Sequence, residues 1–241
     1  MHRVTPGQAT SNATHASAAA LAARGELLST PRRPDRAAPA SGRVRLGLGK
    51  SRDGYLYVPK PGRDGQPLPL IVFLHGAAGN AAQADILLPL AEKHGVLVLA
   101  IDSRASTWDL IQGGFGPDVA FLDSALSFTF ERLSVERERI ALAGFSDGGS
   151  YALSLGLANP QLFANVLAFS PGFARMPESR GDARVFITHG RQDAVLPIER
   201  CSRRVVRRLE SSGYSVDYRE FDGAHTVPSD MLRAGFDWLL R

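Results

Sequence analysis

A serine stands between two glycines in the stretch GFSDG at 144–148, which matches the pattern G-x-S-x-G. The apolar stretch RIALA at 139–143 precedes this serine, and a helical pattern, DGGSYALSLGLA at 147–158, follows it. A tight turn between a buried strand and a helix strains the serine backbone and exposes its hydroxyl beside the helix N-terminus. Flanking glycines leave room for such a turn. This context favours Ser146 as a nucleophile over a serine that only caps a helix.

A serine hydroxyl needs a base near neutral pH, and the base needs an acid that orients it. At a turn of this kind the chain order is serine, then acid, then histidine, and only His189 and His225 follow Ser146. Asp193 comes directly after a predicted strand, whereas Asp222 would need an awkward loop to reach a histidine three residues later. We therefore predict that Asp193 is the acid and His225 the base, and that His189 is structural and bonds to nearby backbone.

Small residues follow the first buried apolar run, in the stretch LHGAAGN at 74–80. Small side chains there let backbone amides approach a substrate carbonyl. We expect the amides of Ala77 and Asp147 to form an oxyanion hole, in which each donor is typically worth about 3 kcal/mol. The alternative is that HGAAG is only a flexible turn.

Apolar runs alternate with helical patterns along the rest of the chain. The expected strands are a short pair at 43–48 and 54–59, then 67–74, 95–101, 139–143, 164–169, 184–188 and 214–221. The expected helices are 81–94, 118–133, 147–158, 197–211 and 228–241. This alternation predicts an α/β fold with a mainly parallel, doubly wound sheet and helices on both faces. The connectors 102–117 and 170–182 are too short for a large lid domain.

The first 43 residues are rich in Ala, Ser, Thr, Pro and Arg, and they read as a flexible arm with at most one short amphipathic helix at 15–29. The catalytic domain is expected over 44–241. Residues 1–60 hold 10 Lys and Arg against 3 Asp and Glu, so the net charge of +4 comes from the N-terminal part and nucleic-acid binding is not indicated. No run approaches the roughly 20 apolar residues that span a bilayer, and no secretory signal is visible, so we expect a cytoplasmic protein without stable membrane insertion.

Cofactor chemistry finds no support in the sequence. The single cysteine, Cys201, excludes an intrachain disulfide, and it lies inside a helical pattern with no partnered base nearby. Neither a metal-ligand spacing nor a phosphate-binding loop is present, so no metal or nucleotide is expected.

From about residue 44 to its end, the chain resembles the α/β-hydrolases, and specifically the compact bacterial serine esterases of the phospholipase/carboxylesterase group, which are similar to acyl-protein thioesterases. The resemblance is carried by FLHGAAGN, GFSDGGSYALSLGLANP, AFSPGF, THGRQDAVLPIERC and FDGAHTVP. It implies Ser146, Asp193 and His225 as a catalytic triad, with Ala77 and Asp147 as amide donors. Polyhydroxybutyrate depolymerases and feruloyl esterases are also similar, through GPDVAFL at 116–122. The HGAAG stretch lacks the cysteine that those secreted relatives often carry, which argues against a secreted depolymerase.

These observations predict a cofactor-free serine esterase that acts on small to medium acyl esters through an acyl-enzyme. Four residues in or beside loops at the catalytic edge are candidates for the substrate walls: Trp108, Phe115, Phe173 and Ile198. Alternatives within the enzyme class are a polyhydroxybutyrate depolymerase, a feruloyl esterase or a thioesterase. An alternative in another class is a catalytically silent protein that keeps the fold and only binds a ligand or partner.

Overall fold

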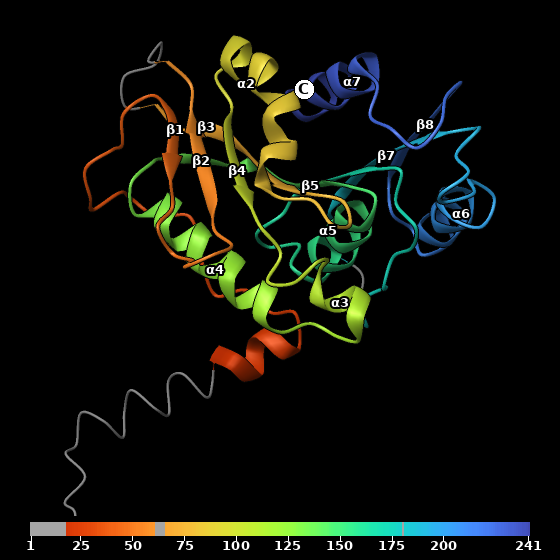
Figure 1. The fold of residues 1–241 in the computed structure, drawn as a ribbon, viewed down its shortest axis with the longest axis horizontal. Coiled ribbons are helices and arrows are strands. Elements are labelled where there is room, and N and C mark those ends of the chain that lie inside the picture. The colour runs from red at the N-terminus through yellow and green to blue at the C-terminus, as the bar shows by residue number, and fades with distance from the viewer. Residues whose placement is uncertain (1–17, 61–65, 180) are drawn as a thin grey trace, which may run out of the picture.

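One eight-stranded sheet forms the centre of the protein (Figure 1). The computed structural model describes residues 18–60, 66–179 and 181–241. The strands are β1 (Gly42–Arg45), β2 (Gly54–Val58), β3 (Leu68–Leu74), β4 (Leu97–Ile101), β5 (Val135–Phe145), β6 (Asn165–Phe169), β7 (Arg184–Gly190) and β8 (Val216–Phe221). Their order across the sheet is β1-β2-β4-β3-β5-β6-β7-β8. All pairs from β4 to β8 are parallel, and only β1 and β2 run antiparallel to their neighbours, so the predicted mainly parallel sheet is confirmed.

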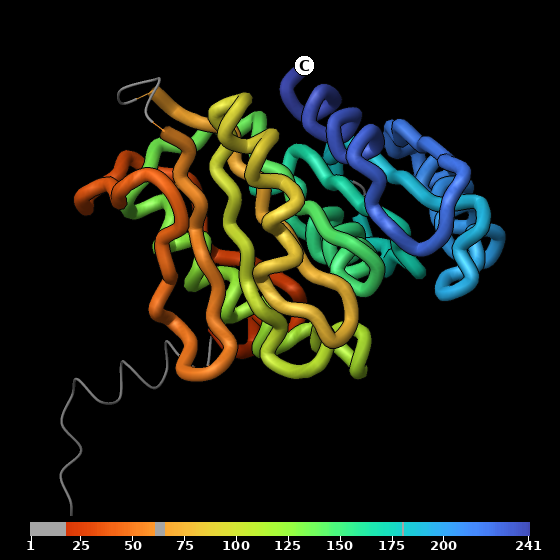
Figure 2. Tube along the Cα trace, turned by 45° about the horizontal axis from the view of Figure 1, so that its top comes forward, coloured from red at the N-terminus to blue at the C-terminus, as the bar shows by residue number. Residues whose placement is uncertain are grey.

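Helices cover both faces of the sheet, as predicted (Figures 1 and 2). They are the 3-10 helix η1 (Ala81–Leu87) and the α-helices α2 (Leu88–His94), α3 (Asp109–Gln112), α4 (Pro117–Phe130), α5 (Asp147–Ala158), α6 (Ser202–Ser211) and α7 (Ser229–Leu239). The core divides into two clusters, one under α4, α5 and α6 and the other under η1, α2 and α7. Along β3, Leu70 and Val72 enter the first cluster and Ile71 enters the second, because successive side chains of a strand point to opposite faces.

The helix predicted over 81–94 is divided at its centre into η1 and α2. Pro89 occupies the first turn of α2, where its missing N–H costs nothing, but its ring would clash with a preceding carbonyl if one α-helix continued through it. Asn80 caps the start of η1, since its side chain accepts a hydrogen bond from the Ala82 amide. The end of α2 is set by Gly95 in the left-handed conformation.

The N-terminal segment differs from the mobile arm expected over 1–43. Residues 18–23 are helical, and the chain from there to β1 lies against α4 and α5 (Figure 1). Asn159, directly after α5, accepts a hydrogen bond from the Leu27 amide and donates one to the Gly25 carbonyl. Asp123 of α4 accepts from the amide of Leu28. The folded domain therefore includes residues 18–41, and residues 1–17 of the expected arm lie outside the described part.

Within the described ranges, no helix is long and apolar enough to cross a membrane.

Candidate active site

Ser146 occupies the sharp turn between β5 and α5, with φ of 58° and ψ of −120°. A positive φ is costly for a residue with a side chain, so the turn holds the serine in a strained conformation. The close approach of the backbone explains both glycines. A Cβ on Gly144 would lie 2.2 Å from the carbonyl oxygen of Gly148, and a Cβ on Gly148 would lie 2.1 Å from that of Leu74. The structure thus contains the strand, turn and helix that the sequence pattern predicts.

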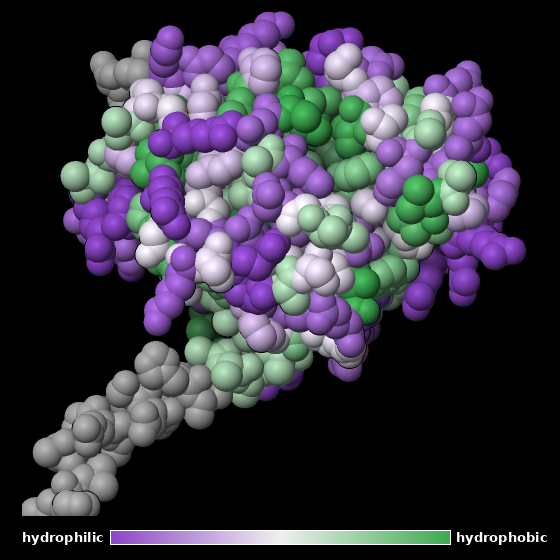
Figure 3. Space-filling model, viewed as in Figure 1, coloured by the Kyte–Doolittle hydropathy of each residue, from purple (hydrophilic) through white to green (hydrophobic). Residues whose placement is uncertain are grey.

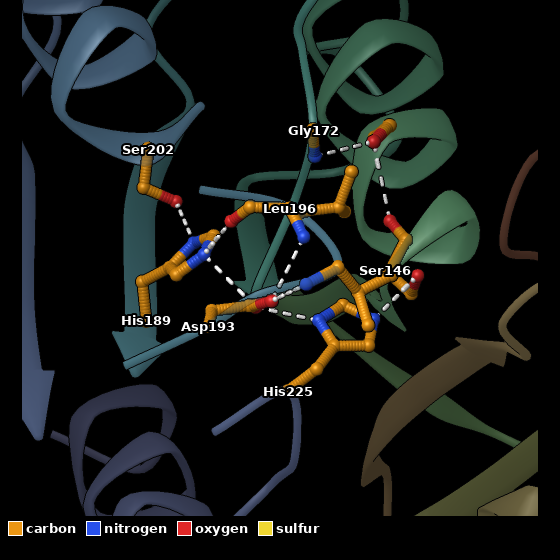
Figure 4. Close-up of polar contacts among 9 residues, drawn as sticks. Ser146, Gly172, His189, Asp193, Leu196, Ser202 and His225 are labelled. Atoms are coloured by element: carbon orange, nitrogen blue, oxygen red, sulfur yellow. Dashed lines mark hydrogen bonds and ion pairs between the residues drawn. The ribbon is translucent and has the colours of Figure 1, made fainter. Parts of the chain in front are cut away.

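The three predicted triad residues form one hydrogen-bonded chain, although they come from three different loops (Figure 4). The Ser146 Oγ lies 2.8 Å from the His225 Nε2, and the His225 Nδ1 lies 2.6 Å from the Asp193 Oδ2. The Asp193 carboxylate can only accept, so His225 carries its proton on Nδ1 and its Nε2 accepts from the serine hydroxyl. In this tautomer the imidazole is prepared to take the proton of Ser146.

Asp193 follows β7, and its carboxylate is held by backbone amides as well as by His225. Its Oδ1 accepts from the amides of Val195 at 2.9 Å and Leu196 at 2.8 Å. Burial acts to raise the pKa of Asp193, but the hydrogen bonds from Leu196, His225 and Val195 outweigh it, and the pKa lies below its usual value. The carboxylate is therefore ionised at neutral pH.

Asp222, the competing acid, lies elsewhere. Its side chain is 77% exposed and pairs with Arg191, at 2.8 Å from the guanidinium. The loop that carries His225 instead packs on the end of β7, where Gln192 donates to the carbonyl of Gly223. A Cβ on Gly190 would lie 2.3 Å from that same carbonyl oxygen, so only glycine permits this contact. Gly190 is a residue of the site that the sequence reasoning did not single out, although it stands in THGRQD.

The loop after β3 approaches the start of α5. Some backbone amides in these two segments donate hydrogen bonds, and others have no acceptor in the described part of the chain. The Gly76 amide donates to the Gln83 side chain at 2.9 Å, and the Ala78 amide donates to the Ser106 carbonyl at 2.7 Å. Among the residues described, the amides of Ala77 and Asp147 have no acceptor. These are the two donors that the sequence predicts for an oxyanion.

A buried histidine supports this loop. The His75 Nδ1 donates to the Gly76 carbonyl at 2.7 Å, and its Nε2 accepts from the Ser103 amide at 2.9 Å. Burial lowers the pKa of His75, so the ring is neutral and this tautomer is retained. The Trp108 indole donates to the His75 carbonyl at 2.8 Å, and the Thr107 hydroxyl donates to the Asp147 carboxylate at 2.6 Å.

The predicted substrate walls are not brought together. Ile198 is buried, and Trp108 is completely buried. The connector 102–117 folds back, so that the Trp108 indole packs on His75. Phe115 packs edge-on against Tyr151, and its ring lies against Gly25 of the N-terminal segment. Phe173 is 39% exposed and lines a surface depression whose lining does not include Ser146 or His225. Three arginines in or near α6 line it as well: Arg200, Arg204 and Arg208.

A cavity of about 270 Å³ does lie beside His225. Its walls are Phe73, Ala82, Ile86, Phe145, Thr226 and Val227, with Gln83. Figure 3 shows hydrophobic surface gathered around this hollow, between η1 and α7. The Phe145 ring lies 4.7 Å from the His225 ring, so the cavity opens directly onto the hydrogen-bonded chain.

Other reactive groups show no comparable arrangement. Burial raises the pKa of the Cys201 thiol, which disfavours the nucleophilic thiolate. Across the described ranges, His, Cys, Asp and Glu side chains form no group of three or more that could hold a metal ion.

Comparison with known proteins finds similarity to esterases. The family profile described as Phospholipase/Carboxylesterase matches residues 121–239. NocK, a proposed esterase from Nocardia uniformis subsp. tsuyamanensis, is 25% identical over 215 residues, which cover 85% of this chain and 56% of NocK. Feruloyl esterase B from Thermothelomyces thermophilus is 29% identical over 126 residues, or 48% of this chain and 43% of that protein. The chain thus spans about half the length of the curated relatives it matches.

Similarity to solved structures concerns the fold. The crystal structure of the Bacillus cereus carboxylesterase superposes with a TM-score of 0.59 at 20% identity, over 78% of this chain and 93% of that one. At this level of identity, the similarity extends to the arrangement of strands and helices.

Proposed function

We propose that the protein is a serine esterase of the carboxylesterase type, which hydrolyses small to medium carboxylic esters; the match to the Phospholipase/Carboxylesterase profile and the similarity to NocK support this. The observation that carries the proposal is the continuous hydrogen-bonded chain from the Ser146 Oγ through His225 to Asp193, with distances of 2.8 and 2.6 Å. A serine that is already within hydrogen-bonding reach of an oriented imidazole can be activated without rearrangement.

The reaction proceeds in two halves through an acyl-enzyme. His225 accepts the Ser146 proton as the oxygen attacks the ester carbonyl, and Asp193 stabilises the resulting imidazolium. The oxyanion of the tetrahedral intermediate accepts hydrogen bonds from the amides of Ala77 and Asp147. His225 then gives its proton to the departing alcohol. A water molecule repeats the sequence on the acyl-enzyme and releases the acid.

The residues that line the cavity beside His225 favour a substrate with a neutral, apolar group. Among the described residues, no Lys, Arg, Asp or Glu lines it, and its volume of about 270 Å³ lies just below the roughly 300–1,000 Å³ of pockets that enclose drug-sized ligands. A short or medium acyl or alkyl group fits this size, whereas a long fatty chain would extend into solvent. The similarity to feruloyl esterase B favours aromatic acyl esters as a second candidate substrate class.

The proposal is tested by a substrate series and by active-site labelling. We expect turnover of p-nitrophenyl butyrate, little turnover of the palmitate ester, and covalent labelling of Ser146 by a fluorophosphonate probe. Ser146→Ala should abolish both activities while leaving the thermal unfolding curve in place. A wild-type protein that neither hydrolyses any ester, thioester or phospholipid nor accepts the probe would instead be the catalytically silent binding protein.

A further inference from the structure

A second histidine contacts the carboxylate of Asp193. His189, near the end of β7, is completely buried, and its Nε2 lies 3.1 Å from the Asp193 Oδ2 (Figure 4). The same nitrogen lies 2.8 Å from the carbonyl oxygen of Leu196, and the Nδ1 lies 2.6 Å from the hydroxyl of Ser202. The ring therefore has polar partners on both nitrogens, one of which is the acid of the hydrogen-bonded chain.

The partners of His189 determine where its proton lies. A carbonyl and a carboxylate can only accept, and both face Nε2, so Nε2 carries the proton, donates it to the Leu196 carbonyl and lies 3.1 Å from the Asp193 Oδ2. Nδ1 is then an acceptor for the Ser202 hydroxyl. Burial lowers the pKa of His189 more than the contacts with Leu196 and Asp193 raise it, so the ring is neutral near pH 7.

Three hydrogen bonds hold the Asp193 carboxylate, and the His189 Nε2 makes a fourth polar contact with it at 3.1 Å. Val195 and Leu196 donate to Oδ1 and His225 donates to Oδ2, which the His189 Nε2 also approaches at 3.1 Å. Leu196 also closes a ring, since its amide donates to Asp193 and its carbonyl accepts from His189. His189 thus restrains both the acceptor oxygen of His225 and the turn that carries it.

We propose that His189 is a positioning residue, whose neutral N–H group holds the Asp193 Oδ2 toward the His225 Nδ1 through its hydrogen bond to Leu196 and its 3.1 Å contact with that oxygen. The proposal rests on the function proposed above for Ser146, His225 and Asp193. The neutral state matters for the chemistry. An arginine or lysine here would restrain the carboxylate equally well, but its charge would offset the negative charge that stabilises the imidazolium of His225.

Two amide variants separate positioning from packing. In His189→Gln the side-chain nitrogen can lie where Nε2 now lies and donate to Asp193, whereas in His189→Asn it lies near the Nδ1 position and falls short. We expect His189→Gln to keep kcat within about threefold of wild type. We expect His189→Asn to lose about 10- to 100-fold in kcat with little change in KM, since small misplacements of a catalytic group cost up to about 10²-fold.

A second measurement does not depend on turnover. The proton on the His225 Nδ1, bonded to Asp193, gives a downfield proton NMR signal in this geometry. This signal should persist in wild type and His189→Gln and broaden through solvent exchange in His189→Asn. A residue that only fills space would change the melting temperature but would leave both this signal and kcat unaffected.

The outcomes are distinguishable from failure of the proposed function. If the wild type neither hydrolyses esters nor reacts with the probe, the function fails, while the NMR comparison still decides the role of His189. Equal kcat and equal signals in the two folded variants would overturn the positioning role. Should His189→Asn not fold, His189→Gln alone decides, because a folded Gln variant that loses both the rate and the signal contradicts the proposal.

Discussion

Replacing Asp193 by Asn should leave the fold intact and inactivate the site by reversing a tautomer. Val195 and Leu196 donate to Oδ1 at 2.9 and 2.8 Å, so the carbonyl oxygen of the new amide will occupy that position. Its NH₂ group then lies where Oδ2 was and faces the His225 Nδ1, 2.6 Å away in the wild type. Nδ1 must become an acceptor, and Nε2 then carries a proton toward Ser146 instead of accepting one.

The size of the effect follows from the two ways in which the site can respond. With the wrong tautomer the serine is not activated, and a loss of about 10⁴-fold in kcat is typical, or about 5.5 kcal/mol at 1.36 kcal/mol per tenfold. Rotation of the amide would restore the tautomer, but it would set NH₂ against two backbone amides in a buried site. Each unsatisfied group costs about 1–3 kcal/mol, so this route costs about 2–6 kcal/mol, and the oxygen that it returns to the His189 N–H offsets only part of that cost. We expect a loss between about 10³- and 10⁴-fold.

The assay is the rate of acylation by p-nitrophenyl butyrate under single-turnover conditions, with thermal unfolding followed by circular dichroism. Asp222→Asn is the matched control, since this aspartate is 77% exposed and pairs only with Arg191 among the described residues. The control should keep close to the wild-type rate. If folded Asp193→Asn stays within about tenfold of the wild type, the assignment of the acid and the tautomer argument are both refuted.

Three further predictions concern the turn, an ion pair and the N-terminal segment. Gly148→Ala should abolish probe labelling and lower stability, because its Cβ would lie 2.1 Å from a β3 carbonyl oxygen, whereas Gly114→Ala, with open space around it, should change neither. The hydrogen bond from Arg203 lowers the pKa of Glu220 from its ordinary value of 4.5 to about 2. The ion pair therefore stabilises the fold fully above pH 4.5, and this stabilisation is lost as the pH falls toward 2. Glu220→Gln should therefore lower the free energy of unfolding in urea by about 1 kcal/mol at pH 7 and leave it unchanged near pH 2. Glu199, whose side chain is 66% exposed, provides the control variant Glu199→Gln. A loss in Glu220→Gln that stays constant with pH, or an equal loss in Glu199→Gln, would contradict this prediction. Asn159→Ala should lower the free energy of unfolding by about 1–3 kcal/mol and make the N-terminal segment sensitive to trypsin, with kcat unchanged. If the variant resists trypsin as the wild type does, the hydrogen bonds of Asn159 do not hold the segment.

The sequence predicted which three side chains meet at the candidate site better than it predicted their surroundings. Ser146 was identifiable because a buried strand, glycines and a helix leave one conformation for the turn, and chain order then separated Asp193 and His225 from their competitors. The structure brings these three side chains into one hydrogen-bonded chain. Local pattern was sufficient here, since the carboxyl ends of parallel strands meet at one edge of the sheet.

Features that depend on how a loop or the N-terminal segment folds back onto the sheet and helices were not predictable. Trp108 stands in a loop beside the catalytic edge, but its indole packs beneath the chain that carries His75, 33 residues away. His189 contacts Asp193 only because the intervening turn folds back, and the spacing of four residues does not reveal this outside a helix. The composition of residues 18–41 is that of a mobile tail, yet buried Ala22 and Leu27 complete a cluster formed by α4 and α5.

The hydrogen bond from Leu27 to Asn159 joins residues 132 positions apart, which has a consequence for synthesis on the ribosome. Chains grow from the N-terminus, so the segment around Leu27 leaves the exit tunnel long before its docking site exists. Until α5 and the residue after it have emerged, that stretch has nothing to pack against and stays accessible to proteases and chaperones. The part of the domain that is made first is therefore among the last to be fixed in place.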